Sequence, residues 1–236
     1  MVILYWIFGR RSFFNSNIES IYFPSNLQKL DDKWYQSSNH LKKVIISPDN
    51  KHFKYADENH QIVIGKSDET KEDYDVIVVG SRDITNVKIS NNIRIINTCA
   101  FKCCPQLEEV EIEPNSKLER IGSNAFSSSG IKKFTIPKSV EIIEPYCFSF
   151  CEKLQKVTIE KGSKLKSISP NLFIFCSKLK EVEIPEESEI KTIGNNAFYS
   201  SPIEKLYIPS SVKELENGWC ERMSELNEIT ISPKNT

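Results

Sequence analysis

The sequence has no excess of charge of one sign and no long apolar run. Its 236 residues include 31 Lys and Arg against 32 Asp and Glu, which leaves a formal net charge of −1. A balance this close gives no electrostatic steering toward nucleic acid or an anionic membrane. The apolar run at residues 1–8 is eight residues long, whereas a membrane-spanning helix needs roughly 18 to 20. We therefore expect no nucleic-acid partner and no direct membrane insertion.

The same run lacks the marks of a secretory signal peptide. Arg10 and Arg11 follow the apolar residues instead of preceding them, and no small-residue cleavage site comes after them. The chain also has no Asn-x-Ser/Thr acceptor for N-linked glycans. These absences favour a cytoplasmic location, and residues 1–8 are interpreted as the inner half of a truncated repeat.

Cysteine occurs in an odd number, at Cys99, Cys103, Cys104, Cys147, Cys151, Cys176 and Cys220. Three of these stand three residues after a phenylalanine, where related segments have Ser129 and Ser201. A position that accepts Cys or Ser predicts a small buried site, not a reactive one. Zinc ligation at 99–104 is disfavoured because no second ligand pair follows at zinc spacing. A disulfide framework is disfavoured by the odd count, although Cys151 and Cys176 could come within bridging distance.

What the sequence does contain is one short pattern, LxxVxI with small variations, repeated six times in residues 107–231. A nearly constant spacing separates the copies, which begin at Leu107, Ile131, Leu154, Leu179, Ile203 and Leu226. A fixed period between roughly 20 and 50 residues indicates a stacked-repeat protein. Neighbouring repeats of this kind must share one core, because none can bury its apolar face alone.

Each copy predicts a short strand, a turn, a second extended piece and a second turn. Alternating apolar residues such as Val182 and Ile184 fit a strand with one face inward. A proline that follows, such as Pro185, ends the strand because proline cannot donate to a ladder. In the IGSNAF segment at 121–126 and the IGNNAF segment at 193–198, Asn124 and Asn196 precede a short apolar patch, which predicts one turn of α- or 3₁₀-helix.

Together these features resemble the BspA-like leucine-rich repeat family of bacterial and protozoan surface antigens. The resemblance rests on LxxVxIP and IGxxAFxxC recurring in register, as in IPKSVEIIEPYCFSFC at 136–151, and covers most of the chain. The chain departs from the family pattern at residues 113–114, 160–161 and 219–220. The resemblance implies an α/β repeat solenoid with a concave parallel sheet and short helical or 3₁₀ turns on the convex side. It also implies binding or adhesion instead of catalysis, with no cofactor.

The first fifty residues are a second copy of the carboxy-terminal segment. Residues 13–50 align with residues 198–235 without a gap, which superposes Trp34 on Trp219. Between the arrays, residues 51–83 lose the repeat period and contain β-rich runs separated by charged, turn-prone connections. We expect a truncated array at 1–50, a small antiparallel β-hairpin insertion at 51–83 and the main array at 84–236.

Local patterns that suggest chemistry fail on their spacing. Gly65-Lys66-Ser67 resembles the end of a phosphate-binding loop, but the glycine needed five residues earlier is His60. The histidines at 40, 52 and 60 match no standard set of metal ligands and are interpreted as surface residues. A repeat surface offers no pocket that brings a nucleophile and a base together. We expect no catalytic, cofactor or metal site, and an enzyme is the remote alternative.

The informative surface is the predicted parallel sheet, where equal positions of adjacent repeats become neighbours about 4.8 Å apart. One outward column alternates in charge along much of its length, so its members can pair. Another carries exposed Tyr22, Ile45 and Tyr207, which are typical of protein contacts, although cross-strand packing of β-forming residues also explains them. The candidate partner-binding residues are Tyr22, Ile45, Lys88, Glu111, Lys133, Thr135, Lys156, Thr158, Glu181, Glu183, Lys205 and Tyr207.

We therefore expect a non-enzymatic protein-binding scaffold that uses its concave sheet. The resemblance implies a surface antigen or adhesin at the cell surface, with a host-cell protein as partner. An intracellular scaffold that binds a protein of its own cell is the alternative. The absent signal peptide, membrane span and glycan acceptors favour that alternative, as do unpaired cysteines, which are uncommon outside the cell.

Overall fold

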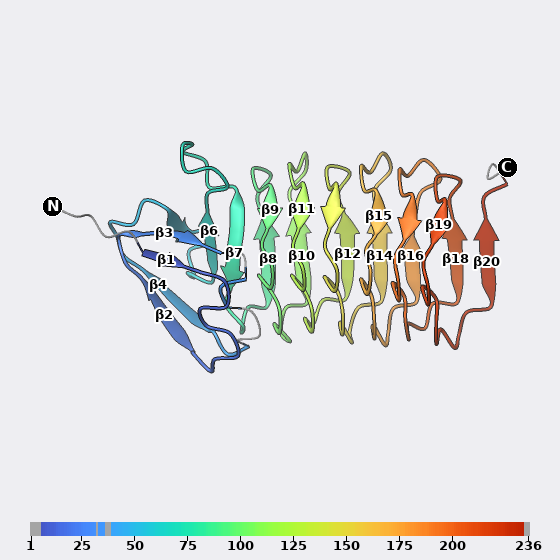
Figure 1. The fold of residues 1–236 in the computed structure, drawn as a ribbon, viewed down its shortest axis with the longest axis horizontal. Coiled ribbons are helices and arrows are strands. Elements are labelled where there is room, and N and C mark those ends of the chain that lie inside the picture. The colour runs from blue at the N-terminus through green and yellow to red at the C-terminus, as the bar shows by residue number, and fades with distance from the viewer. Residues whose placement is uncertain (1–5, 32, 36–38, 234–236) are drawn as a thin grey trace.

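The computed structural model describes residues 6–31, 33–35 and 39–233 (Figure 1). Of the apolar run at 1–8, residues 1–5 lie outside the described residues. The strands are β1 (Trp6–Phe8), β2 (Ser20–Phe23), β3 (Leu27–Leu30), β4 (Lys43–Ile46), β5 (Phe53–Tyr55), β6 (Ile62–Gly65), β7 (Val76–Gly80), β8 (Asn86–Ile89), β9 (Ile95–Ile96), β10 (Glu109–Ile112), β11 (Arg120–Ile121), β12 (Lys133–Ile136), β13 (Ile142–Ile143), β14 (Lys156–Ile159), β15 (Ser167–Ile168), β16 (Glu181–Glu183), β17 (Thr192–Ile193), β18 (Lys205–Ile208), β19 (Glu214–Leu215) and β20 (Glu228–Ile231).

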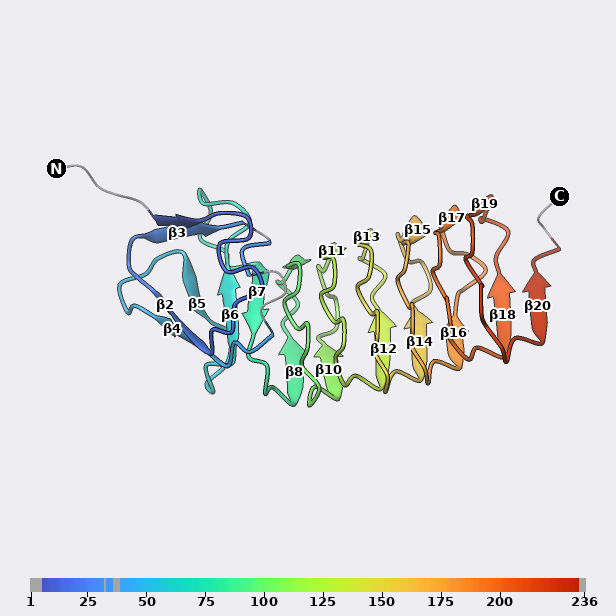
Figure 2. The ribbon, with the colours of Figure 1, turned by 60° about the horizontal axis from the view of Figure 1, so that its bottom comes forward.

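From β8 onward, each turn of the chain contributes one longer and one shorter strand. Where neighbouring longer strands pair, they pair in parallel, as Val157 of β14 does with Phe134 of β12, and the two-residue strands that pair do so likewise. Figure 2 separates the two rows, which follow a nearly straight axis. We call the outward surface of β8, β10, β12, β14, β16, β18 and β20 the long-strand face. The outward surface of the two-residue strands β9, β11, β13, β15, β17 and β19 is the short-strand face. The expected parallel repeat solenoid is confirmed.

The interior of the solenoid holds one column of stacked phenylalanines. Phe101, Phe126, Phe148, Phe173 and Phe198 are all fully buried. Their successive ring centroids lie 5.3, 5.5, 5.6 and 5.6 Å apart, with nearly parallel planes. The rings of Phe126, Phe148 and Phe173 each pack against those of both neighbouring turns, so these turns cannot bury their apolar residues without their neighbours.

The predicted helical turns are wrong: the described part of the chain contains no helix. In the turn at 122–129, Ala125 N–H bonds to Gly122 O within the turn, whereas Phe126 N–H bonds to Cys147 O on the next turn. Asn124 adopts a left-handed φ of 55° and Ser128 one of 57°, so neither continues a right-handed helix. A helix would keep these N–H groups within one segment. In this segment every second N–H group bonds to a carbonyl oxygen of the next turn instead.

Residues 53–80 form three antiparallel strands at the junction of the two arrays. β5 pairs with β6 and β6 with β7, both antiparallel, while β7 pairs in parallel with β9. The insertion therefore extends the row of short strands. Phe53 and Val63 of the insertion share a buried cluster with Trp34 and Leu41 of the first array, which gives the junction a core of its own.

Arg82 is buried in this junction and connects its segments by hydrogen bonds. Its guanidinium is buried and donates hydrogen bonds to the carbonyl oxygens of Gly80 at 3.1 Å, Ala100 at 3.0 Å and Cys99 at 3.3 Å. It also lies over the ring of Tyr35, 5.2 Å from the centroid. Arg82 thus joins the first array to the first turn of the main array.

Candidate functional site: the long-strand face

The long-strand face is not one continuous ladder, and proline explains where it is interrupted. In four steps the residue after the strand donates its N–H to the previous turn: Glu113, Glu160, Ser47 and Ser232 bond to Ile89, Ile136, Phe23 and Ile208. Each of these steps pairs four residues. Where Pro137 or Pro209 takes that position, the donor is missing, and no ladder joins β10 to β12 or β16 to β18. Pro185 leaves a ladder of three residues between β14 and β16.

The interruption between β10 and β12 opens a groove of about 710 Å³ on the long-strand face. Val110 and Ile112 line it and are half-buried, whereas Phe134 and Ile136, one turn later at the same positions, are 2% and 0% exposed. Lys133 and Thr135 form part of the opposite wall. The groove is therefore a place where inward apolar residues become reachable from the surface.

The groove also separates two charges that a closed ladder would pair. Glu109 and Lys133 stand at equal positions on β10 and β12, and both side chains are exposed. The side chain of Lys133 has no hydrogen bond or ion pair within the described residues. Lys133 instead lies beside Lys156 in the ladder with β14. A free ammonium group next to half-buried apolar side chains can bind an acidic group of a partner.

Most other charges on this face pair between turns, as the alternating column predicts. Lys156 contacts Glu183 at 2.7 Å and Glu181 at 3.0 Å, and Thr158 donates to Glu183 at 2.7 Å. The hydrogen bond from Lys156, followed by that from Thr158, lowers the pKa of Glu183, while Glu183 raises the pKa of Lys156. Exposed pairs of this kind contribute little to stability but fix the pattern of charge on the face.

Two further pairs lie toward the ends of the face. Lys88 lies 3.8 Å from Glu111, and Lys205 lies 2.6 Å from Glu228. The contact with Lys205 lowers the pKa of Glu228. Ten of the predicted site residues, from Lys88 to Tyr207, thus lie on one face.

Tyr22, Ile45 and Tyr207 do not form the shared exposed column on one face that the sequence predicts. Tyr22 and Ile45 are paired neighbours, 55% and 40% exposed, but β2 and β4 form a separate sheet that runs obliquely to the main array in Figure 1. They do not extend the long-strand face. Tyr207 was expected to be exposed and is half-buried, because its hydroxyl donates to Glu186, a contact that raises the pKa of Tyr207. It is held by its own chain.

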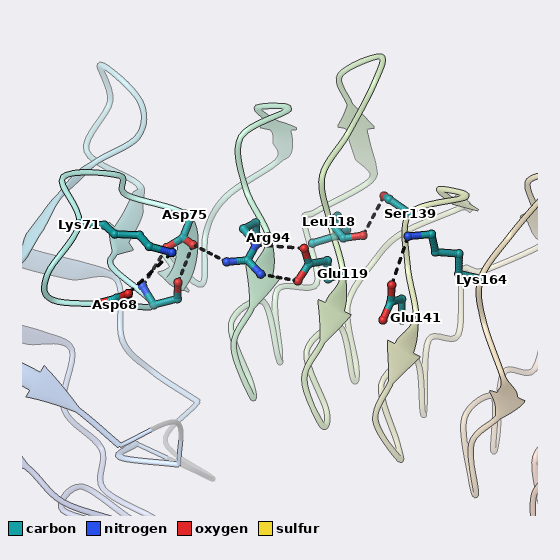
Figure 3. A network of polar contacts seen from close by, with 10 residues as sticks. Asp68, Lys71, Asp75, Arg94, Leu118, Glu119, Ser139, Glu141 and Lys164 are labelled. Carbon is teal, nitrogen blue, oxygen red and sulfur yellow. Dashed lines mark hydrogen bonds and ion pairs between the residues drawn. The ribbon is translucent and has the colours of Figure 1, made fainter.

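Outside the long-strand face, ion pairs join the insertion to the main array (Figure 3). Arg94 bonds to Glu119 through Nε at 3.0 Å and Nη2 at 2.7 Å, and its Nη1 lies 3.7 Å from buried Asp75. Lys164 contacts Glu141 further along, 3.3 Å away. The charges drawn there are engaged within the chain, in contrast with Lys133.

The local patterns that suggested chemistry have structural partners. Ser67 of the Gly-Lys-Ser segment bonds to Asp75 through its N–H at 2.8 Å and its hydroxyl at 2.6 Å. His52 Nδ1 lies 2.6 Å from Glu69, and His60 stacks on Tyr55. Within the described residues no group of three or more His, Cys, Asp or Glu is placed to hold a metal ion. The same residues include no helix with the length and hydropathy for crossing a membrane.

Comparison with known families decides the relationship. The model of the BspA type leucine-rich repeat region matches residues 6–60, 79–188 and 158–236, in six copies. The chain belongs to the BspA type leucine-rich repeat family. The stretch between the first two matches, residues 61–78, contains β6 and most of β7.

Solved structures of this class show the same fold. The chain is similar to a leucine-rich repeat protein from Eubacterium ventriosum, with a TM-score of 0.67 and 21% identity over 92% of this chain and 62% of that one. It is also similar to a leucine-rich cell surface protein from Faecalibacterium prausnitzii, with a TM-score of 0.57 and 20% identity over 75% and 54%. The chain therefore spans less than two thirds of either protein. A comparison with curated proteins finds no match.

The groove at Val110 and Ile112 was not among the predicted site residues. The signal that could have found it is the alternation of residues after the strand: Glu113 and Glu160 have an N–H to donate, and Pro137 between them does not. From the sequence alone, each proline predicts only the end of its own strand. Its effect on the neighbouring turn became visible only with the ladders in place.

Proposed function

We propose that the chain is a non-enzymatic scaffold that binds a protein partner on its long-strand face, centred on the groove between β10 and β12. One observation carries the proposal: the ladder is interrupted beside Pro137, which leaves Val110 and Ile112 half-buried next to Lys133, whose side chain is unpaired among the described residues. Apolar contact area with a charge at its rim is the usual make-up of a protein-binding surface. The division into 1–50, 51–83 and 84–236 is part of this proposal, with binding confined to the last part.

The partner chemistry follows from the walls of the groove. An apolar side chain fits between Val110 and Ile112, and an acidic group beside it reaches Lys133. The paired charges on β14, β16 and β18 then provide a polar surround. For the location, we propose the cell surface, as a surface antigen or adhesin, in line with the family and with the cell surface protein that shares the fold.

An intracellular scaffold is the second candidate, and the cysteines favour it. None of the seven, all of which lie within the described residues, forms a disulfide, and unbridged cysteines are typical of a reducing compartment. The binding surface would be the same, with a partner from the same cell instead of a host cell.

The test compares groove variants with a matched control. The immobilised chain is used to capture proteins separately from host-cell surface extracts and from lysate of its own cell. Ile112→Lys and Lys133→Glu should abolish capture of a partner that the unaltered chain retains. Lys164→Glu, away from the long-strand face, should retain it. Equal capture by all variants would place the interface elsewhere, and the extract that yields the partner separates the two locations.

A further inference from the structure

Lysine is concentrated where three adjacent long strands begin. The segments that lead into β12, β14 and β16 carry six lysines, namely Lys132, Lys133, Lys153, Lys156, Lys178 and Lys180, which we call the lysine cluster. The same segments, residues 130–133, 153–156 and 178–181, contain one acidic residue, Glu181. The whole chain has a net charge of −1, so the excess of positive charge is local to this part of the surface.

Part of the lysine cluster lines a hollow of about 790 Å³ beside the groove. Its wall includes Lys133, Lys156, Lys178 and Lys180. Lys133 also lines the groove between β10 and β12, so the two depressions meet at this side chain. The groove offers the apolar side chains of Val110 and Ile112, whereas the hollow offers ammonium groups. A ligand that lies across both therefore contacts apolar groups at one end and positive charge at the other.

Two lysines of the cluster share one glutamate. Lys132 Nζ lies 2.7 Å from a carboxylate oxygen of Glu108, and Lys153 Nζ lies 3.5 Å from the other oxygen. The hydrogen bond from Lys132 lowers the pKa of Glu108. One negative charge here faces two positive charges, and both lysine side chains remain exposed. The chain therefore neutralises these ammonium groups only in part.

Within the hollow, the unpaired positive charges lie on the side nearer the groove. Lys156 and Lys180 contact glutamates of the next turn. Lys178 is exposed and, like Lys133, its side chain has no hydrogen bond or ion pair in the part of the chain that the structure describes. Glu225, also in the wall, stands at the same repeat position as Lys178 but two turns further from the groove. The hollow thus has free ammonium groups where it joins the groove.

The spacing of the turns sets the length of chain that a ligand of both depressions needs. Lys133 and Lys178 belong to turns two apart, and β12, β14 and β16 pair in one ladder, so their levels differ by about 10 Å. In an extended segment, side chains on the same side lie about 7 Å apart, because they alternate along the chain. An apolar residue in the groove and acidic residues two and four positions later therefore extend from the groove to Lys178.

We propose that the partner binds through an extended acidic segment, whose apolar residue enters the groove and whose following carboxylates bind Lys133 and Lys178. The inference rests on the proposed function, because it assigns the chemistry of the segment that the groove receives. Carboxylates are complementary in charge to unpaired ammonium groups. A sulfated polysaccharide also carries negative charge, but it has no apolar side chain to place between Val110 and Ile112. A protein segment supplies both groups.

The primary test measures binding of a fluorescent peptide to the full chain. The peptide has one leucine, glutamates two and four residues after it, and serine at every other position. We expect saturable binding that weakens in high salt, which screens exposed charges. Control peptides, with glutamine for both glutamates or serine for the leucine, should bind at least about fivefold more weakly. No binding of the leucine–glutamate peptide at concentrations up to about 1 mM overturns the proposal.

Variants of the chain locate the bound peptide. Lys178→Glu removes an unpaired ammonium group and should weaken binding of the leucine–glutamate peptide about fivefold, with little effect on the glutamine peptide. Lys191→Glu makes the same change of charge at an exposed position beside β17, on the short-strand face, and should bind like the unaltered chain. Equal weakening by the two variants would show a general effect of net charge and overturn the proposal. Melting of each variant excludes misfolding.

Failure of this inference is distinguishable from failure of the proposed function. In the capture experiment, Lys178→Glu should reduce capture of the partner, as Ile112→Lys does. Capture that Ile112→Lys abolishes and Lys178→Glu leaves unchanged would retain the groove as the interface and overturn the acidic segment. Heparin serves as the polysaccharide probe. Binding of heparin through Lys178, with no binding of the peptide, would make a polysaccharide the occupant of the hollow and also overturn the proposal.

Discussion

The thiol of Cys151 donates a hydrogen bond to the carbonyl oxygen of Phe126 on the preceding turn, with the two atoms 3.0 Å apart. Cys176 makes the same contact with Phe148 at 3.0 Å, and the hydroxyl of Ser201 makes it with Phe173 at 2.9 Å. A buried donor to the previous turn is therefore what this repeat position requires. Cys and Ser both satisfy it, which explains why the sequence uses them interchangeably.

Cys151→Ser should consequently be tolerated. We expect a loss of less than about 1 kcal/mol in the free energy of unfolding, because the donor is kept. Cys151→Val removes the donor and changes the shape of a fully packed site, so it should cost about 1–3 kcal/mol. Urea denaturation of the two variants measures the difference. An equal cost would mean that packing alone, and not the hydrogen bond, selects the residue.

The thiols should differ strongly in reactivity. Burial raises the pKa of Cys151 to about 11, and burial also raises the pKa values of Cys147 and Cys176. Because the thiolate is the reactive form, these groups stay protonated and unreactive at pH 8. Titration of the native chain with a thiol reagent should modify Cys103 and Cys220, which are half-buried, and all seven cysteines only after unfolding. Rapid modification of Cys151 in the native chain would contradict its placement.

The phenylalanine column should carry a large share of the stability. Phe148→Ala should cost about 3–5 kcal/mol, because it leaves a cavity between the rings of two neighbouring turns. Phe150 is the matched control: it is 47% exposed and has a left-handed φ of 57°. Phe150→Asn should be nearly neutral, since asparagine tolerates this conformation. Thermal unfolding of both variants checks the contrast, which should disappear if the two rings are equally buried in solution.

Pro137→Ala should repair the ladder between β10 and β12. The alanine has the N–H that Glu113 and Glu160 use at the equivalent position, so it can donate to Ile112. Hydrogen exchange should show protection at residue 137 and added protection along β12. In the proposed binding assay the same variant should weaken capture, because Val110 and Ile112 become covered. An unprotected amide at residue 137 would show that something other than the proline holds the groove open.

Acid should weaken the contacts between turns. The hydrogen bonds from Lys156 to Glu183 and from Lys205 to Glu228 lower the pKa of each glutamate below its ordinary value of 4.5. A carboxyl whose pKa is lower in the folded state stabilises the fold above its unfolded pKa and loses that contribution as the pH falls through the folded value. The melting temperature should therefore decline as the pH drops below about 4.5. Combined Lys156→Met and Lys205→Met should flatten this decline.

Features that recur in every repeat could be predicted from the sequence, whereas features that depend on contacts between turns, as at Pro137 and Asn124, could not. The constant repeat period predicts the parallel stack, its inward positions and the pairing of charges such as Lys156 with Glu181. It also predicts which phenylalanines form the column. These features depend on positions that recur in every turn, so the pattern states them directly.

What the sequence by itself determined is thus the repeat, its family and the facing of its side chains. Tertiary structure alone decided three features that depend on contacts between turns. Near Asn124, hydrogen bonds to the next turn take the place of the expected helical turn. The missing N–H at Pro137 opens the groove between β10 and β12. The hydroxyl of Tyr207 donates a hydrogen bond to Glu186 instead of facing solvent. In each case the deciding group lies on another turn, distant along the chain, where a local pattern carries no signal.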